Sequence, residues 1–426
     1  MRHIRATLVA ASCLAALFLP LQAHSATDDA ALDLVPAASD TPKKANERAL
    51  RLFVEVAAGR LSQRYGLATE DARRASIDLN WEYRPSPQWR AVLSDRLDDV
   101  HPVDAGSRST LNSLREAFIG WQDEAGQLAF DLGRVNVRHG PGYGFNPTDY
   151  FRDGASRAVT TADPLALREN RLGTAMFRVQ RLWNGGNVSL TLAPKLRDGP
   201  SNDSFSVDLG ATNHADRALL ATSLQASDKF SLQAFAFHER HKGLQLGANA
   251  TALVSDSLVA FAEWSGGKDH DLLSAAFDPV AKVVNRQRAT VGMTYTTPSK
   301  LALTAEFEYN GFALDKKQWQ QAVAARGVEQ LGDYLYVVQQ RQDIASRKAV
   351  LLYASQRDAG VKNLDVTGLV RYNAEDHSRF VWAEARYHWP RFDLALQWQA
   401  NLGRAESEYG AVPGKRLIQL LGAFYF

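Results

Sequence analysis

Apolar and polar residues alternate along most of this chain with a period of two. In 77–84, isoleucine, leucine, tryptophan and tyrosine occupy the odd positions, and charged or amide residues occupy the even ones. The alternation returns in 301–310 and 392–399, and 418–426 carries an apolar face at every second position. Because successive side chains of a strand point to opposite faces, each segment predicts a β-strand with one apolar face.

The polar faces of these segments carry many charges, and aromatic residues cluster at the segment ends. A water-soluble β-sandwich also alternates, but it turns its apolar face inward. Apolar-out, polar-in segments of about ten residues with aromatic girdles are typical of a transmembrane β-barrel, whose closed sheet satisfies every backbone hydrogen bond in lipid. The girdle residues are Trp81, Tyr83, Trp89, Trp121, Trp183, Trp264, Tyr387 and Trp389.

Short and long connections alternate between the segments. Tight turns are predicted at sites such as Asp123–Gly126 and Pro390, and longer polar links at sites such as 266–287. Such barrels have short periplasmic turns and long external loops. The pattern therefore predicts an all-β fold, a single antiparallel transmembrane barrel over 47–426 with about 18 strands. Counting 203–211 as a strand would break the alternation, so it is placed in an external link; 16 strands is the alternative count.

The N-terminus predicts export. A basic start, an apolar run and small residues indicate a signal peptide at 1–26, followed by a short periplasmic segment at 27–46. The only cysteine, Cys13, lies in that apolar run, so no disulfide, thiolate metal site or cofactor is expected. The mean hydropathy of −0.28 excludes a helical membrane bundle, and the net charge of +2 gives no argument for nucleic acid as a partner.

The chain ends in Leu-Gly-Ala-Phe-Tyr-Phe, and Phe426 is its last residue. This end resembles the C-terminal insertion signal of Gram-negative outer-membrane proteins. In size and strand count the chain is similar to the porin-like and alginate-export-like barrels of about 18 strands. The resemblance implies the cell outer membrane as location, with outer-membrane lipid, lipopolysaccharide and the barrel-assembly machinery as partners. A homo-oligomer fits the same class.

The link 135–170 carries the densest group of special residues. Gly140, Gly142 and Gly144 permit tight turns, and Asn146–Asp149 predicts an Asx-type turn that starts a short helix. The segment resembles the loop found after an early strand in porin-like barrels. If it folds inward as the loop of porins does, it forms a pore constriction that sets solute selectivity. The alternative is an external loop whose charges meet water. The constriction residues would be Arg134, Arg138, Asp149, Arg152, Asp153, Arg168, Glu169 and Arg171.

Strand parity also predicts a charged lumen. The chain has 36 arginines against 13 lysines, and the planar guanidinium binds carboxylates and phosphates bidentately. The alternative is that these charges pair across strands and stiffen the wall. The residues assigned to the lumen are Asp78, Glu82, Arg90, Arg96, Arg178, Glu306, Glu308, Asp365, Arg371, Glu384, Arg386 and Asp393.

Signals for catalysis are weak. No G-x-S-x-G, H-E-x-x-H or phosphate loop is present, and the odd spacing of His238 and His241 puts them on opposite faces of a strand. Within 311–345, helical spacing predicts an external loop with a helix. We therefore expect not an enzyme but a porin-like channel for passive passage of small polar or anionic solutes, with acidic sugars or polysaccharide as a narrower class. The alternative is a barrel with an occluded lumen that acts as an enzyme or a surface-binding protein.

Overall fold

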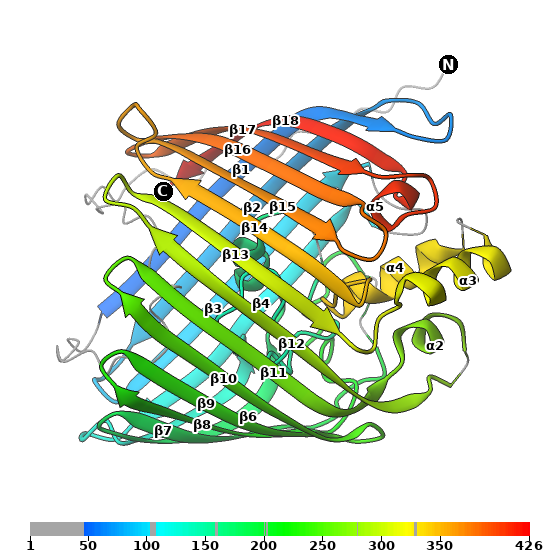
Figure 1. Ribbon diagram of the computed structural model, residues 1–426. Helices are drawn as coiled ribbons and strands as arrows, with labels where there is room; N and C mark the ends of the chain where they lie inside the picture. Colours follow the sequence, from blue (N-terminus) through cyan, green and yellow to red (C-terminus); the bar gives the residue numbers. More distant parts are fainter. Residues whose placement is uncertain are drawn as a thin grey trace, which may run out of the picture.

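The computed structural model describes residues 47–102, 108–157, 161–199, 201, 203–278, 280–327 and 330–426. Over these residues the chain forms one closed antiparallel β-barrel, with four of its five helices gathered at one end (Figure 1). The predicted signal peptide (1–26) and the segment 27–46 lie outside the described residues.

Eighteen strands, counted over the described residues, form the wall, and five helices lie in the connections. The strands are β1 (Glu47–Gln63), β2 (Glu70–Arg84), β3 (Trp89–His101), β4 (Thr110–Gln122), β5 (Leu128–Val135), β6 (Thr174–Trp183), β7 (Gly186–Ala193), β8 (Arg217–Ser227), β9 (Phe230–Glu239), β10 (Gly243–Ser255), β11 (Leu258–His270), β12 (Val283–Thr296), β13 (Leu301–Asn310), β14 (Lys348–Gln356), β15 (Leu364–Asn373), β16 (Arg379–Trp389), β17 (Phe392–Leu402) and β18 (Gly414–Tyr425). The helices are α1 (Pro164–Glu169), α2 (Leu272–Phe277), α3 (Lys316–Arg326), α4 (Leu331–Gln340) and α5 (Glu408–Ala411).

Each strand pairs antiparallel with its neighbours in sequence, and β1 closes the ring by pairing with β18. The register places Phe53 opposite Tyr425 and Leu61 opposite Leu417, so β1 begins and β18 ends at the same end of the barrel. The predicted all-β barrel of about 18 strands is confirmed. The segment 203–211 forms turns and not a strand, which agrees with its predicted place in a long external link.

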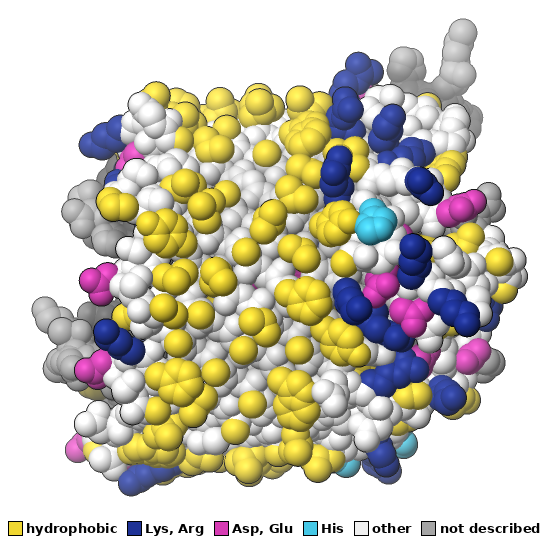
Figure 2. Space-filling view, in the orientation of Figure 1, with side chains coloured by type: hydrophobic (Ala, Val, Ile, Leu, Met, Phe, Trp, Pro, Cys, Tyr) yellow, Lys and Arg dark blue, Asp and Glu magenta, His cyan; other side chains and the backbone are white. Residues whose placement is uncertain are grey.

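Burial follows strand parity, with the polar face hidden and the apolar face exposed. In β13, Thr304, Glu306 and Glu308 are buried, whereas Leu303 and Phe307 are exposed. Figure 2 shows the result on one face as a broad apolar belt across the barrel, with most charged side chains gathered beyond its edges. A sheet that exposes its apolar face and encloses its charges is arranged for lipid outside and water inside.

None of the helices in the described parts of the chain is long and apolar enough to cross a membrane.

The long links gather at one end of the barrel, but several are shorter than the pattern predicted. The predicted link 266–287 is strand at both ends, because β11 continues to His270 and β12 starts at Val283. The reason is that strands of a barrel extend past the apolar belt, where their outward residues become polar and the alternation of hydrophobicity fades.

Helices α2 to α5 pack together at this end. Helices α3 and α4 occupy the segment where helical spacing predicted a helix; a capping box of Asp315 and Gln318 starts α3, and Gly327 ends it. Trp319 and Tyr334 belong to a buried apolar cluster that joins α2, α3 and α4. These loops therefore form a packed cap with a core of its own.

Candidate functional site

The connection between β5 and β6, residues 136–173, enters the barrel; we call it the inward loop. Its tip donates hydrogen bonds from Gly142 N to Glu263 Oε1 (2.6 Å) and from Gly144 N to Glu306 Oε2 (2.8 Å). Glu263 and Glu306 lie in the middle of β11 and β13, six and eight strands away from β5 around the ring. The tip therefore crosses the interior at about the mid-height of the barrel.

Close approach explains the three glycines of the tip. A Cβ atom on Gly140 would lie 2.3 Å from Glu263 Oε2, and one on Gly144 would lie 2.2 Å from Glu308 Oε1. Gly140 also has a φ of +93°, a conformation that L side chains rarely adopt. The glycines let the backbone touch the wall, where Arg371 Nη2 completes the contact by donating to Gly144 O at 2.5 Å.

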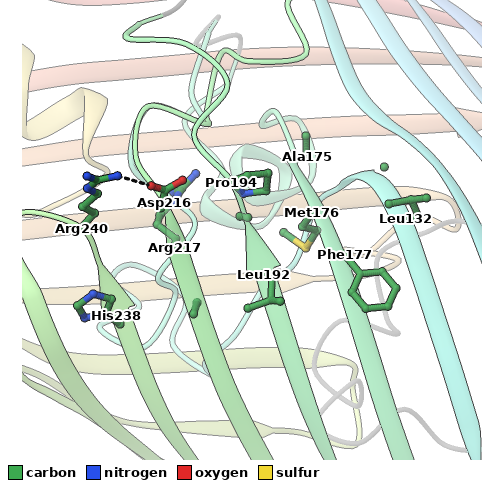
Figure 3. A pocket seen from close by; sticks show the side chains of 13 residues that line it. Leu132, Ala175, Met176, Phe177, Leu192, Pro194, Asp216, Arg217, His238 and Arg240 are labelled. Carbon is green, nitrogen blue, oxygen red and sulfur yellow. Dashed lines mark hydrogen bonds and ion pairs between the residues drawn. The ribbon is translucent and has the colours of Figure 1, made fainter.

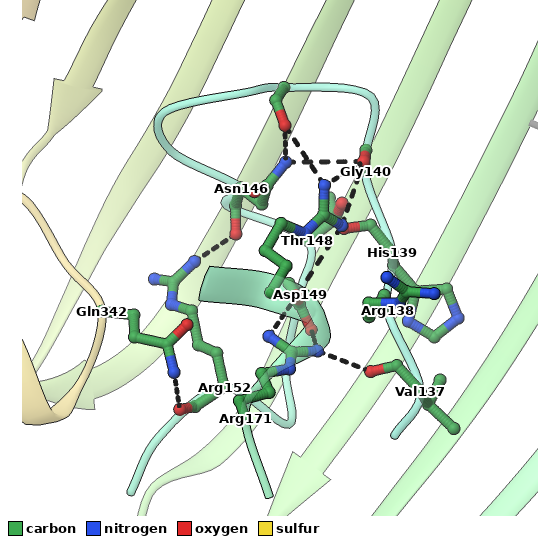
Figure 4. A network of polar contacts seen from close by, with 12 residues as sticks. Val137, Arg138, His139, Gly140, Asn146, Thr148, Asp149, Arg152, Arg171 and Gln342 are labelled. Carbon is green, nitrogen blue, oxygen red and sulfur yellow. Dashed lines mark hydrogen bonds and ion pairs between the residues drawn. The ribbon is translucent and has the colours of Figure 1, made fainter. Parts of the chain in front are cut away.

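The inward loop is braced from within by a buried ion pair. Arg171 donates to both carboxylate oxygens of Asp149 (2.7 and 3.0 Å) and to Val137 O (2.7 Å), as Figure 4 shows. Burial alone would raise the pKa of Asp149, but Arg171 and Arg168 outweigh it and lower that pKa below its ordinary value. The bidentate pair ties one end of the loop to its middle, and the bond from Arg171 to Val137 O joins its two ends.

The expected helix at Asn146–Asp149 is absent. Asp149 N donates to Asn146 O at 3.2 Å, which makes a turn, and Asn146 instead donates its side-chain amide to Glu263 at 3.1 Å. Because that amide is used to anchor the tip, the chain does not continue as a helix here. The described part of the loop forms its helix later, at α1, where Asp163 is the N-cap.

A second contact fixes the inward loop to the wall near the helical cap. Arg152 donates to Asp343 at 2.7 Å, and Lys242 lies 3.3 Å from Asp153. Figure 4 shows Arg152 between Asn146 and Gln342, with which it also forms hydrogen bonds. Arg288, Arg341, Glu239 and Asp269 complete a buried cluster of four basic and four acidic groups around a cavity of about 30 Å³. Equal numbers of both signs make the burial of so many charges tolerable.

Of the other predicted constriction residues, two face the open interior and one lies outside the inward loop. Arg138 and Glu169 have side chains that are 38% and 49% exposed and lie 3.8 Å apart, so they face the open part of the interior. Arg134 lies apart from the inward loop, at the end of β5, where it donates to the carbonyl oxygens of Leu114 and Asp208.

The N-cap residue of helix α1, Asp163, has a carboxyl group with a raised pKa. Burial raises the pKa of Asp163 to about 6 against the hydrogen bond from Leu165 N, and the nearby carboxylates of Glu384 and Glu169 act in the same direction as burial. Glu384 belongs to β16, and at the other end of α1 the Arg168 guanidinium donates to the carbonyl oxygens of His139, Gly140 and Gly142.

The residues predicted for the lumen lie on the inward-facing parity, and most are paired. Asp78 accepts from Arg96 at 3.2 Å and from Arg115 at 2.6 and 2.8 Å, and Arg90 donates to Asp131 at 2.9 Å. The other pairs are Glu82 with Arg84, Glu308 with Arg371, Glu384 with Arg386, Arg386 with Asp393, and His388 with Asp365. Arg178 is half-buried on β6.

The sequence analysis overlooked Arg115, Asp131 and Glu263. Asp131 and Glu263 stand at inward positions of the same alternation, so strict application of parity to β5 and β11 would have found them. Arg115 lies at a β-bulge of β4, between the residues that pair with Ser94 and Asp95, where the alternation breaks and parity gives no signal. In the parts of the chain that the structure describes, no group of three or more His, Cys, Asp or Glu residues could hold a metal ion.

A closed 18-stranded antiparallel barrel with an apolar belt, a charged interior and a loop folded to mid-height is a fold that this chain shares with outer-membrane porins. The chain is similar in fold to OccAB1 of Acinetobacter baumannii (TM-score 0.57, 10% identity, 90% of this chain and 98% of that one). It is also similar to OpdQ (0.55, 11%, 89% and 98%) and OccK5 (0.52, 8%, 88% and 98%) of Pseudomonas aeruginosa. No protein-family model matches the chain, and no curated protein matches it in sequence.

Proposed function

We propose that this chain is an outer-membrane channel for the passive passage of small polar or anionic solutes, with the inward loop as its constriction. The observation that carries the proposal is the anchoring of the tip to Glu263 and Glu306, in the middle of strands on the far side of the ring. A loop held at mid-height narrows the lumen and surrounds a passing solute with fixed charges.

Charges of both signs face the narrowed space. Arg138 in the inward loop and Glu169 on α1 have side chains that are 38% and 49% exposed. Arg90 and Glu82 add charges of both signs to the inner wall further along, beside the short turn between β2 and β3. A mixed lining replaces part of the hydration of polar solutes without excluding either sign. Within this proposal, the resemblance to alginate-export barrels and the excess of arginine over lysine favour acidic sugars or polysaccharide as the narrower class.

Membrane insertion forms part of the same proposal. Phe426 is exposed at the closing seam, where its backbone N–H donates to Leu52 O at 3.0 Å. We infer that this terminal residue is the signal that the barrel-assembly machinery reads, and that lipid covers the belt. An assembly of several copies would use the same outer surface.

The test is single-channel recording of the refolded barrel in planar bilayers, with the reversal potential measured in a salt gradient. We expect stable conductance steps, and a shift toward cation preference in Arg138→Ala because one exposed positive charge leaves the constriction. The matched control is Arg181→Ala on the outward face of β6, which should behave as wild type. A folded barrel without conductance would refute the channel and favour an occluded barrel that acts as an enzyme or a surface-binding protein.

A further inference from the structure

A row of polar side chains crosses the inner wall of the barrel, with one residue on each strand from β14 to β18. We call it the polar track, and its members are Ser355, Thr367, Glu384, Gln397 and Gln419. The register sets each member directly opposite the next. All have inward parity, since residues beside them such as Val366, Leu396 and Leu420 are exposed and apolar. Ala302 on β13 and Gly59 on β1 continue the row beyond its two ends.

Hydrogen bonds link neighbouring members of the polar track. Ser355 Oγ and Thr367 Oγ1 lie 3.3 Å apart. Gln419 donates its side-chain amide to Gln397 Oε1, and Gln397 donates in turn to Glu384 Oε2. Arg386 balances the charge of Glu384 through hydrogen bonds of 2.7 and 3.1 Å. The track therefore presents hydroxyl and amide groups without net charge.

The polar track leads along the channel as well as around its wall. Strands of such barrels tilt by about 35–45°, so a row perpendicular to the strands climbs the wall. Ser355 is the second-last residue of β14, beside the short turn to β15, whereas Glu384 and Gln419 lie halfway along β16 and β18. Because short turns mark the periplasmic end, the track rises from the periplasmic mouth to about the mid-height of the barrel. The inward loop narrows the lumen at the same height.

Two tyrosines connect the tip of the inward loop with the track. Tyr143 of the tip and Tyr353 of β14 lie with ring centroids 5.4 Å apart. The hydroxyl of Tyr353 forms a hydrogen bond with Thr367, and that of Tyr143 forms one with Thr304 on β13. A tyrosine offers an apolar ring beside a hydroxyl group, so C–H and O–H groups of one solute can both find partners here.

Other surfaces of the barrel offer different chemistry. The inner wall of β2 to β6 carries paired charges such as Arg90 and Asp131, which suit ions. A groove of about 680 Å³ lies on the outer surface across β5 to β9. Figure 3 shows the side chains of Leu132, Phe177 and Leu192 along this groove, and they have no donors or acceptors for hydroxyl groups. The polar track differs from both, because it is polar and has no net charge.

We propose that the polar track binds saccharides as they pass between the constriction and the periplasmic mouth. This inference rests on the proposed channel and names its substrate class. Hydroxyl and amide groups both donate and accept hydrogen bonds, as the hydroxyl groups of a sugar do. Neighbouring strands lie about 4.8 Å apart, so the track presents such groups at regular intervals over about 19 Å. A chain of sugar rings also repeats its hydroxyl groups regularly, so it exchanges one partner for the next as it advances.

The experiment measures binding to the folded barrel in detergent by isothermal titration calorimetry, and passage by transient blockade of the current in planar bilayers. The probes are maltotetraose and, as an acidic counterpart, a tetramer of galacturonate. Thr367→Val combined with Gln419→Leu removes two polar groups of the track and keeps side chains of similar size. The matched control is Asn80→Leu, which replaces an amide on the inward face of β2, away from the track. Heat-modifiable mobility shows whether each variant has folded.

We expect both probes to bind wild type, and the double variant to bind each of them about 25-fold more weakly, since each lost hydrogen bond is worth about fivefold. The control should bind as wild type. Unchanged binding by the double variant, or a loss confined to the acidic probe, would overturn the proposal.

Calorimetry needs no current, so its result is separate from the test of the channel. A barrel that passes potassium chloride but binds neither probe would overturn the saccharide track and leave the channel. A barrel that binds the probes through the track without conducting would refute the channel and support the track as a binding site.

Discussion

Glu263→Ala tests whether the tip of the inward loop is held in the lumen as described. The carboxylate accepts hydrogen bonds from Gly142 N (2.6 Å), Asn146 Nδ2 (3.1 Å) and Thr148 Oγ1 (3.0 Å). At a net value of about 1 kcal/mol for each bond, the variant loses about 3 kcal/mol of anchoring free energy. Since 1.4 kcal/mol is a factor of ten, the detached population of the tip should rise by about 100-fold.

The assay is single-channel recording, with the mean conductance and the open-channel noise compared between variants. A detached tip widens the path and moves within it, so both quantities should increase in Glu263→Ala. Glu263→Gln is the matched control, because its amide oxygen still accepts from Gly142 N, and its noise should stay near that of wild type. If Glu263→Ala folds and conducts with the noise and conductance of wild type, the tip does not narrow the pore.

Three further outcomes are expected. The carboxyl of Asp163 has a pKa of about 6, so it loses its negative charge between pH 7 and pH 5. The reversal potential should therefore shift toward anion preference as the pH falls. Asp163→Asn should abolish this shift. Gly144→Ala puts a Cβ 2.2 Å from a wall carboxylate and should cost about 1–3 kcal/mol in thermal unfolding, whereas Gly332→Ala, with nothing within 4 Å, should not. Arg152→Ala removes one partner of Asp343 in a buried cluster and should lower the unfolding free energy by about 3–5 kcal/mol in a denaturant titration. An unchanged midpoint would show that the contact between Arg152 and Asp343 does not hold the inward loop to the wall.

The barrel could be predicted from the sequence because alternation is a local property. Within about ten residues, the alternation of each strand predicts its apolar and its polar face. The helical spacing of apolar residues in 315–343 likewise predicted the helical segment that forms α3 and α4. Helices α1, α2 and α5 are only six, six and four residues long, too short for a periodic signal. Local patterns therefore determined the wall and left the short helices unrecognised.

The path of the inward loop could not be derived from local patterns. Gly142 and Glu263 are 121 residues apart, and Tyr143 and Glu306 are 163 apart, so nothing near either residue reveals the contact. The glycines suggested tight turns, whereas their main role is close approach to wall carboxylates. The sequence could name the charged residues but not which of them brace the loop and which, like Arg138, face open space.

The seam between β1 and β18 constrains how the molecule is made. Phe53 pairs with Tyr425, and Arg64 donates to the carbonyl oxygens of Tyr409 and Val412. The first strand pairs with β2 on one side, but it obtains its second partner only when the last strand is synthesised. Until then both edges stay open to any other chain, and pairings of such long range form slowly. The cell must therefore keep the whole polypeptide unfolded and shielded through synthesis and export, and a chain truncated by even its last strand would be a substrate for degradation.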